Sequence, residues 1–305
     1  MAKNNNLHTA KKAKNDEFYT QLCDIENELK HYRQHFVGKV VYCNCDDARE
    51  SNFFKFFSLN FEFLGLKKLI STGYKENGKG VKLVYEGDKN GNKMPDFDEI
   101  EVTELEGDGD FRSAECIELL KEADIVVTNP PFSLFREYVA QLVEYGKQFL
   151  IIGSQNAITY KETFPLIKEN KLWLGLHLCK QFKQPNGEMK KFGNICWFTN
   201  MEHDKRNMPF DLYMKYSNEY FPKYDNYDVI EVSKVCDIPM DFDGVMGVPI
   251  TFLHKYRPEQ FEIIGMAEDN GKGMSGKESK WDGLNPHCVI NGKNMYKRIF
   301  IRHKR

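Results

Sequence analysis

Residues 124–132 read Asp-Ile-Val-Val-Thr-Asn-Pro-Pro-Phe, and they limit the possible folds more than any other segment. Three apolar residues, two of them β-branched valines, precede a polar stop and two prolines, which predicts a buried strand that ends abruptly in a rigid loop. Each proline fixes φ and lacks an N–H, so the carbonyl groups of the loop can be held in fixed directions. Asn129 is then expected at the carboxyl end of a strand, where open α/β sheets bind ligands. The alternative interpretation is a proline-rich turn after a core strand.

Strand-like and helix-like segments alternate over the first two-thirds of the chain. Strands are expected at residues 39–45, 68–72 and 148–152, and helices at 113–123 and 134–145. This alternation predicts the α/β class with a mostly parallel sheet. Further strands are expected at residues 81–85, 99–105, 172–178 and 194–199.

The pattern changes beyond about residue 200, where β-rich runs at 229–232, 248–253 and 261–266 follow one another without helices between them. We therefore expect a flexible basic arm over residues 1–15, an α/β domain over 16–200 and a separate region over 201–305. Tyrosines and lysines alternate in this last region, which suits base stacking and phosphate contact, but tyrosines at helical spacing are more often a packed face. The tyrosines are Tyr213, Tyr216, Tyr220, Tyr224 and Tyr227.

The composition excludes several classes of protein. A formal charge of −2 over 305 residues indicates no general affinity for polyanions, so nucleic-acid binding has to rest on local basic clusters. Such clusters occur at residues 3–14 and 293–305, where solvated termini are the simpler interpretation. No apolar run approaches the roughly 20 residues of a membrane span, and the polar start lacks a signal-peptide segment, so we expect a cytoplasmic protein. The eight cysteines include no Cys-x-x-Cys pair and predict buried thiols; no metal is expected.

The Asn-Pro-Pro-Phe sequence resembles the signature of amino-group methyltransferases that use S-adenosyl-L-methionine. The resemblance implies that the Asn129 side-chain oxygen and the Pro130 carbonyl accept hydrogen bonds from an exocyclic amine. Phe132 would stack on the ring that carries this amine, and Pro131 would stiffen the loop. Two acceptors on the amine hydrogens favour a more tetrahedral nitrogen and stabilise the positive charge that develops during transfer.

The same resemblance implies where the methionine end of the cofactor binds. An aromatic-Tyr-Thr segment lies against it in such enzymes, and Phe18, Tyr19 and Thr20 resemble that segment, although a helix cap would look similar. Asp46 or Asp47, after the first strand, would engage the methionine ammonium group. This turn contains no glycine, whereas close backbone approach to a nucleotide-type cofactor usually requires one.

The adenine end of the cofactor would meet Asp110 and Phe111, because Gly-Asp-Phe resembles the adenine-binding stretch of these enzymes. Asp110 would serve as a helix N-cap just as readily. Asn129 would also border the cofactor. The second strand lacks the terminal acid that usually binds the ribose hydroxyls and offers Ser71, Thr72 and Tyr74 instead.

A closer resemblance, over nearly the whole chain, is to the EcoRI-type adenine-specific methylases. It is carried by residues 16–28, 41–57, 228–265 and 291–302, and it accommodates the glycine-free turn. The resemblance implies a Rossmann-like methyltransferase domain over 16–200, a target-recognition region over 201–305, and N6-methylation of an adenine swung out of duplex DNA.

The implied context is a prokaryotic or phage restriction–modification system or an orphan enzyme. We expect a monomer, with double-stranded DNA as partner and a cognate restriction endonuclease in the first of these cases. Asn-Pro-Pro-Phe also occurs in enzymes that resemble guanine-N2 RNA methylases and glutamine-N5 protein methylases, so methylation of RNA or protein is the alternative. A catalytically silent DNA-binding relative is a second alternative, favoured by the glycine-free turn.

Overall fold

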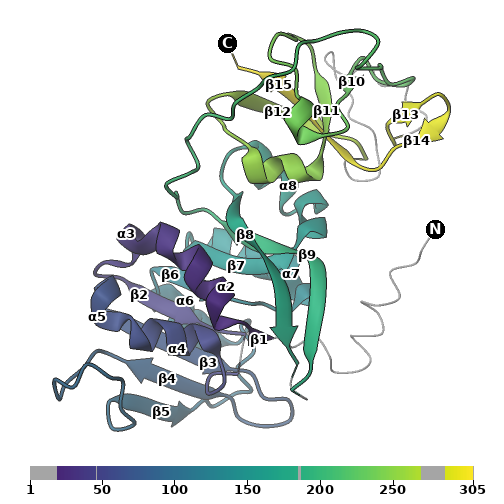
Figure 1. Cartoon of the computed structure of the whole chain (residues 1–305). Coiled ribbons are helices and arrows are strands. Elements are labelled where there is room, and N and C mark those ends of the chain that lie inside the picture. Colours follow the sequence, from purple (N-terminus) through teal and green to yellow (C-terminus); the bar gives the residue numbers. More distant parts are fainter. Residues whose placement is uncertain (1–18, 46, 185–186, 269–285, 305) are drawn as a thin grey trace. The chain divides into compact units, whose positions relative to one another are not determined.

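The computed structural model describes residues 19–45, 47–184, 187–268 and 286–304 (Figure 1). These residues form two compact units. The first contains the described residues up to Ala157 together with Leu174–His203, and the second contains Ile158–Trp173 and the residues from Asp204 onward. The second unit thus includes a segment, Ile158–Trp173, from inside the 16–200 range expected for the α/β domain. The predicted arm at residues 1–15, Phe18 and Asp46 lie outside the described residues.

The first unit is built on a nine-stranded sheet of order β1-β8-β9-β7-β6-β2-β3-β4-β5. The four central strands β7, β6, β2 and β3 are parallel, and the strands paired with them at either side are antiparallel. The predicted α/β class is therefore confirmed. The sheet is mixed, and the expectation of a mostly parallel sheet was wrong, because only β7, β6, β2 and β3 pair in parallel and the strands added on either side are antiparallel. The strands are β1 (Tyr19–Thr20), β2 (Val40–Cys43), β3 (Lys68–Gly73), β4 (Val81–Tyr85), β5 (Ile100–Glu104), β6 (Ile125–Thr128), β7 (Gln148–Ser154), β8 (Trp173–Lys183) and β9 (Met189–Thr199).

The order of the sheet reverses at β2. From β2 the chain passes to β3 on one side, and it later returns to β6 on the other side of β2. Such a reversal leaves a crevice outside the carboxyl ends of the two strands that flank it, because their connections leave in opposite directions. The residues that follow β2 and β6 therefore border the expected ligand site.

Helices cover the faces of this sheet (Figure 1). Serine hydroxyls cap two of them: Ser51 accepts a hydrogen bond from the N–H of Phe53, and Ser113 accepts one from the N–H of Cys116. Gly65 ends α5 in the left-handed conformation, at φ 63°. The helical segments are α2 (Leu22–Leu29), η1 (Lys30–Tyr32), α3 (Arg33–Phe36), α4 (Asn52–Leu59), α5 (Phe61–Leu64), α6 (Ala114–Glu122), η2 (Phe132–Leu134), α7 (Phe135–Glu144) and η3 (Gln155–Thr159).

The β8–β9 hairpin is longer than the sequence indicates. Residues 180–191 are polar and were expected to separate two short strands, but β8 continues to Lys183 and β9 begins at Met189. Ser154, the last residue of β7, pairs with Ile195, so residues 189–194 of β9 extend beyond the carboxyl edge of the parallel strands. There β8 pairs with β1, with Thr20 opposite Phe182.

The second unit contains a four-stranded sheet of order β10-β11-β15-β12 and a two-stranded hairpin. The expected strand over 248–253 is only partly correct, because its second half forms the 3-10 helix η5. Tyr224 and Tyr227 lie in the core, whereas Tyr213 and Tyr220 are exposed, and none of the tyrosines between 213 and 227 is in a helix. The elements are α8 (Phe164–Lys168), β10 (Ile230–Glu231), η4 (Val235–Asp237), β11 (Met246–Pro249), η5 (Ile250–Lys255), β12 (Phe261–Met266), β13 (Val289–Ile290), β14 (Lys293–Asn294) and β15 (Arg298–His303).

A buried ion pair lies inside the second unit. Arg298 donates to both carboxylate oxygens of Glu231, at 3.0 and 2.7 Å, and Tyr224 and Ser233 also donate to this carboxylate. Glu231 and Arg298 are 3% and 7% exposed. These donated hydrogen bonds satisfy a charge that would otherwise be costly to bury.

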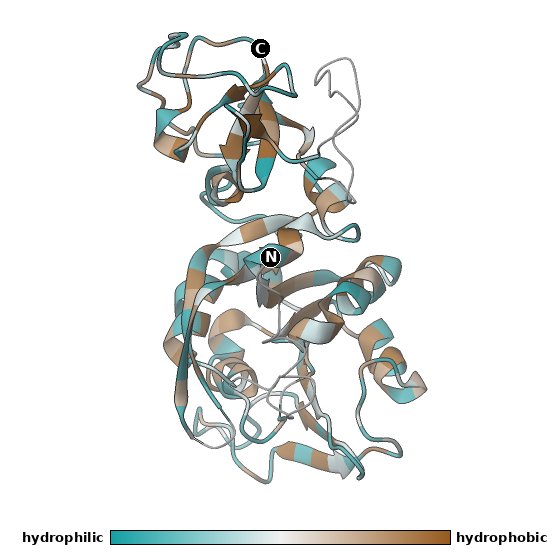
Figure 2. Cartoon of the chain, turned by 90° about the vertical axis from the view of Figure 1, so that its right-hand side faces the viewer, coloured by the Kyte–Doolittle hydropathy of each residue, from teal (hydrophilic) through white to brown (hydrophobic). Residues whose placement is uncertain are grey.

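Hydropathy follows the strands in both units (Figure 2). Hydrophobic residues run along the strands of each sheet, and hydrophilic residues occupy most loops and the outer faces of helices. Among the described residues, no helix combines the length and apolar character needed to cross a bilayer.

Candidate functional site

A cavity of about 200 Å³ lies at the carboxyl edge of the parallel strands in the first unit. Its lining comes from the segments that follow β2, β3 and β6 and from the loop before α6, so it occupies the position expected from the strand reversal. The lining is aromatic and apolar on several sides and carries one carboxylate and one guanidinium group. The lining residues are Cys45, Tyr74, Gly109, Asp110, Phe111, Arg112, Pro131 and Leu134.

This cavity brings together residues that the sequence singled out separately. Asp110 and Phe111, expected at the adenine end of the cofactor, line it together with Pro131 of the Asn-Pro-Pro-Phe loop. Phe111 is buried, and its ring meets that of Tyr138 edge to face at a centroid distance of 5.0 Å. Gln141 also donates a hydrogen bond to the Phe111 carbonyl at 3.2 Å, so the Phe111 side of the cavity is anchored to α7.

Arg112 holds the carboxylate of Asp110. Its Nε donates to Asp110 Oδ1 at 2.9 Å, its Nη2 donates to Oδ2 at 2.7 Å, and its main-chain N–H donates to Oδ1 at 2.8 Å. These hydrogen bonds lower the pKa of Asp110 below its usual value. Arg112 is itself held by Glu137 at 3.0 Å. A carboxylate has about four acceptor positions, so one remains for a ligand amine.

Gly109 lets the chain turn next to this carboxylate. Its φ is +84°, a conformation that residues with a Cβ rarely adopt. A Cβ at this position would lie 2.5 Å from the Gly73 carbonyl oxygen. The loop can therefore approach the end of β3 only because glycine occupies this position.

The Asn-Pro-Pro-Phe loop follows β6 as predicted. Asn129 and Pro130 are buried, Asn129 being 8% exposed, whereas Pro131 and Phe132 are half-buried. Phe132 begins the short helix η2 and packs on the main core of the unit. The loop is therefore a fixed wall of the carboxyl edge, with its aromatic residue only partly covered.

Asn44, the residue after β2, accepts hydrogen bonds from residues before and after this loop. Thr128, immediately before Asn129, donates a hydrogen bond from its hydroxyl to the Asn44 carbonyl. Tyr138, in the first turn of α7, donates from its hydroxyl to the Asn44 side-chain oxygen. Asn44, Thr128 and Tyr138 are all 2% exposed or less.

The segment expected at the methionine end of the cofactor lies at the same edge. Tyr19 and Thr20 form β1, which pairs with β8 where the hairpin extends past the carboxyl edge. Asn52, the first residue of α4, donates a hydrogen bond to the Thr20 carbonyl at 2.7 Å. This contact ties β1 to the helix that follows the glycine-free turn.

Asp47 is exposed and caps its own turn. Its Oδ1 accepts hydrogen bonds from the main-chain N–H groups of Arg49 at 2.9 Å and Glu50 at 3.2 Å. It is not among the residues that line the cavity. Its role toward a methionine ammonium group stays a prediction, and Asp46 lies outside the described residues.

Several residues at the site were missed or only half recognised in the sequence. Tyr74, one of three residues considered for the ribose, lies directly after β3 and lines the cavity, whereas Ser71 and Thr72 are buried within β3. Cys45 also lines it and has a positive φ of 66°, which places a left-handed residue in the turn that lacks glycine. Tyr74 follows the strand predicted over 68–72, and Cys45 is the last residue of the strand predicted over 39–45, so a position at a strand end was the available indication.

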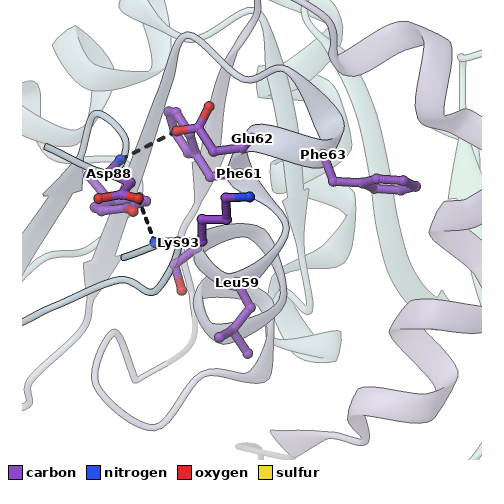
Figure 3. A pocket seen from close by; sticks show the side chains of 8 residues that line it. Leu59, Phe61, Glu62, Phe63, Asp88 and Lys93 are labelled. Atoms are coloured by element: carbon purple, nitrogen blue, oxygen red, sulfur yellow. Dashed lines mark hydrogen bonds between the residues drawn. The ribbon is translucent and has the colours of Figure 1, made fainter. Parts of the chain in front are cut away.

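A second cavity, of about 410 Å³, lies at the opposite edge of the sheet (Figure 3). The turn after β4 forms one wall, and because β4 runs antiparallel to β3, this turn lies at the amino ends of the parallel strands. Glu62 accepts a hydrogen bond from the Asp88 N–H, and Asp88 accepts one from the Lys93 N–H. No residue predicted for the methyltransfer site belongs to it. Its lining residues are Ser58, Leu59, Phe61, Glu62, Phe63, Tyr85, Asp88 and Lys93.

The sheet whose strand order reverses at β2, the cavity at that switch point and the Asn-Pro-Pro-Phe loop together define an α/β methyltransferase. Sequence comparison specifies the group within that class: the model of the adenine-specific methyltransferase EcoRI family matches residues 6–304. The chain belongs to this family.

Three curated relatives match the chain over almost its full length. The type II methyltransferase M.EcoRI of Escherichia coli is 52% identical, with 100% of this chain and 98% of the relative covered. M.MpnI of Mycoplasma pneumoniae is 43% identical, with 98% of each chain covered. M.MgeORF184P of Mycoplasma genitalium is 39% identical over 97% of this chain and 98% of the relative. The predicted family and the methyltransferase activity are confirmed, and the family implies a methyl donor.

Proposed function

We propose that this protein transfers the methyl group of S-adenosyl-L-methionine to the N6 nitrogen of adenine in double-stranded DNA. The observation that carries the proposal is the cavity in which Asp110, Phe111 and Pro131 meet. At this edge of the sheet, two residues expected to contact the cofactor lie beside the loop that would hold the acceptor amine. The named relatives are type II methyltransferases, and the family is adenine-specific.

We propose that the cavity holds the adenosine part of the donor. Its volume of about 200 Å³ is below the roughly 300–1,000 Å³ of a pocket for a whole drug-sized ligand, which suits one portion of a larger molecule. The Asp110 carboxylate would accept a hydrogen bond from the adenine amine, Phe111 and Pro131 would contact the ring, and Tyr74 would lie beside the ribose. When bound, the donor supplies an electrophilic sulfonium methyl group.

Asn129 and Pro130 would act on the acceptor. The lone pair of an aromatic amine is delocalised into its ring, so the nitrogen is a poor nucleophile until its hydrogens are held out of the ring plane. The Asn129 side-chain oxygen and the Pro130 carbonyl would accept these hydrogens and stabilise the positive charge that builds up on nitrogen. Because both residues are buried in a proline-stiffened loop, little reorganisation is needed at the moment of transfer.

The target adenine has to leave the duplex, because its amine is paired inside the helix. Unstacking costs a few kcal/mol, and stacking on the half-buried Phe132 ring would offset about 1–3 kcal/mol of it.

We assign Tyr19 and Thr20 to the methionine end of the donor, together with Phe18, Asp46 or Asp47.

We assign target recognition to the second unit. Three of its tyrosines present large exposed rings, Tyr213 at 79%, Tyr220 at 54% and Tyr296 at 65% exposure, and such rings suit contact with bases or sugars. Because its relatives are named type II methyltransferases, we expect this protein to belong to a restriction–modification system. Its counterpart would be an endonuclease that acts on the same site. We also expect the methyltransferase to act as a monomer.

The test is a transfer assay with methyl-labelled S-adenosyl-L-methionine and three separate acceptors: unmethylated duplex DNA, ribosomal RNA and a protein extract. The proposal predicts label in DNA alone, recovered as N6-methyladenine after digestion. Label in RNA or protein with none in DNA would contradict the acceptor. Calorimetric titration with the donor addresses the silent-relative alternative, since a silent DNA-binding protein would bind no donor and transfer nothing.

A further inference from the structure

We propose that Asn44, Thr128 and Tyr138 form a positioning network. It would hold the Asn-Pro-Pro-Phe loop, here called the catalytic loop, in a fixed position beside the cavity lined by Asp110 and Phe111, here called the donor cavity. The inference rests on the proposed function and concerns residues that do not line the cavity. We call these three residues the strand-end network.

The network brackets the catalytic loop. Thr128 is the last residue before Asn129, and Tyr138 lies in the first turn of the helix that follows the loop. Both hydroxyls donate to one residue, Asn44: Thr128 to its carbonyl and Tyr138 to its side-chain oxygen. The chain between Thr128 and Tyr138 is thus fastened at both ends to the carboxyl end of β2, the neighbouring strand.

The network also reaches the donor cavity. The Tyr138 ring packs edge to face on Phe111, which lines the cavity, and Cys45, the residue after Asn44, lines it too. A shift of Asn44 would therefore move the cavity wall and the catalytic loop together. Because transfer requires the methyl group and the amine nitrogen in line, such a shift would act on the rate of the chemical step.

Burial makes the network rigid. Asn44 is 2% exposed, and Thr128 and Tyr138 are 0% exposed. Burial raises the pKa of Tyr138 well above its usual value, so its hydroxyl keeps the proton that it donates to Asn44 throughout the physiological pH range. In a water-excluded setting neither hydroxyl has an alternative partner in solvent, which favours one arrangement of the loop.

The closing experiment compares two valine substitutions in the same sheet. Thr128→Val removes the hydroxyl next to the catalytic loop. Thr199→Val is the matched control: Thr199 is also 0% exposed and donates to a main-chain carbonyl, that of Phe149 at 2.7 Å, but it ends β9 at the opposite edge of the sheet. Both variants lose a buried hydrogen bond to a main-chain carbonyl. Thr199 also accepts a hydrogen bond from the Met201 N–H at 3.0 Å, so Thr199→Val should lower the unfolding midpoint at least as much as Thr128→Val.

Their kinetics should differ. We expect Thr128→Val to lower kcat about tenfold to a hundredfold with little change in the KM for the donor, the scale of loss that a misplaced reacting group causes. Thr199→Val should keep kcat within about twofold, and Thr128→Ser, which restores the hydroxyl, should recover most of the loss. Tyr138→Phe should lower kcat in the same direction.

Two results would overturn the network: wild-type kcat in Thr128→Val, or an equal loss of kcat in Thr199→Val. Failure of the proposed function is distinguishable from either, because the unsubstituted protein would then transfer no methyl group to DNA.

Discussion

The side-chain amide of Asn52 donates a hydrogen bond to the main-chain carbonyl of Thr20, at 2.7 Å. Thr20 belongs to the two-residue strand β1, and Asn52 begins the helix after the glycine-free turn. A two-residue strand has few contacts of its own, so this hydrogen bond and the pairing with β8 fix its position. Through this hydrogen bond, the start of α4 positions the segment assigned to the methionine end of the donor.

Asn52→Ala should weaken donor binding. Loss of one hydrogen bond to the main chain costs about 1 kcal/mol, which corresponds to roughly a fivefold to tenfold rise in the Kd for S-adenosyl-L-methionine. Asn60→Ala is the control, because Asn60 makes the same kind of contact at the other end of α4, to the Phe56 carbonyl at 2.8 Å. Isothermal titration would measure both; equal Kd values in the two variants would refute the role of Asn52.

Gly109→Ala should damage the cavity that we propose binds the donor. The new Cβ would face the Gly73 carbonyl at 2.5 Å, and the required φ of +84° adds a backbone cost of about 1–3 kcal/mol. Gly107→Ala, two residues earlier in the same loop, is the control, since a Cβ there meets no atom within 4 Å. Thermal unfolding and donor titration should separate the two variants, and equal behaviour would show that the close approach is dispensable.

Arg112→Gln should make the protein more sensitive to acid. In the folded chain the pKa of Asp110 lies below its usual value near 3.8 because Arg112 donates to both carboxylate oxygens. The associated stability is present above the unfolded pKa and is lost as pH falls through the lower folded pKa. Without the guanidinium group the folded pKa returns toward the unfolded one, so this stabilisation disappears.

The acid unfolding midpoint of Arg112→Gln, followed by circular dichroism, should therefore lie at a higher pH than that of the unsubstituted protein. The pair is partly exposed, so the loss should stay within about 1 kcal/mol. Lys121→Gln, which removes an exposed ion pair with Glu118 on α6, should leave the midpoint unchanged. A midpoint for Arg112→Gln identical to that of the unsubstituted protein would rule out the stabilising role of the pair.

Arg298→Met should destabilise the second unit strongly. It leaves the Glu231 carboxylate buried without its charged partner, at a cost of about 3–5 kcal/mol. Arg302→Met on the same strand removes the partly exposed pair with Glu262 and should cost no more than about 1 kcal/mol. Calorimetric unfolding of the full chain would compare them, and similar losses would contradict the importance of burial.

The sequence predicted the strand and loop around Asn129 well, because both are specified by residues that are close in the chain. The valine run before Asn129 forms the buried strand β6, and the double proline ends it, as the composition of the stretch requires. Ser113 likewise marks the start of α6. In each case the residues that decide the structure are neighbours in the chain.

Other features depend on contacts distant in the chain. The polar residues 180–191 extend a hairpin because β8 pairs with β1, about 160 positions earlier. Tyr224 is buried because it donates to the Glu231 carboxylate that Arg298 also holds. Tyr220, which is four residues earlier in the chain, is exposed. The three-way meeting of Asn44, Thr128 and Tyr138 spans more than 90 positions and has no sequence pattern.

The most direct measurement is the map of N6-methyladenine, by long-read sequencing, in DNA from otherwise methylation-free cells that express the chain or its Asn129→Ala variant. We expect methylated adenines at one short recurring sequence with the unsubstituted chain. We expect none, or a reduction of about 100-fold or more, with Asn129→Ala, whose affinity for S-adenosyl-L-methionine should be nearly unchanged. Full methylation by Asn129→Ala would exclude the role of Asn129, and no methylated adenine with the unsubstituted chain would exclude the proposed activity.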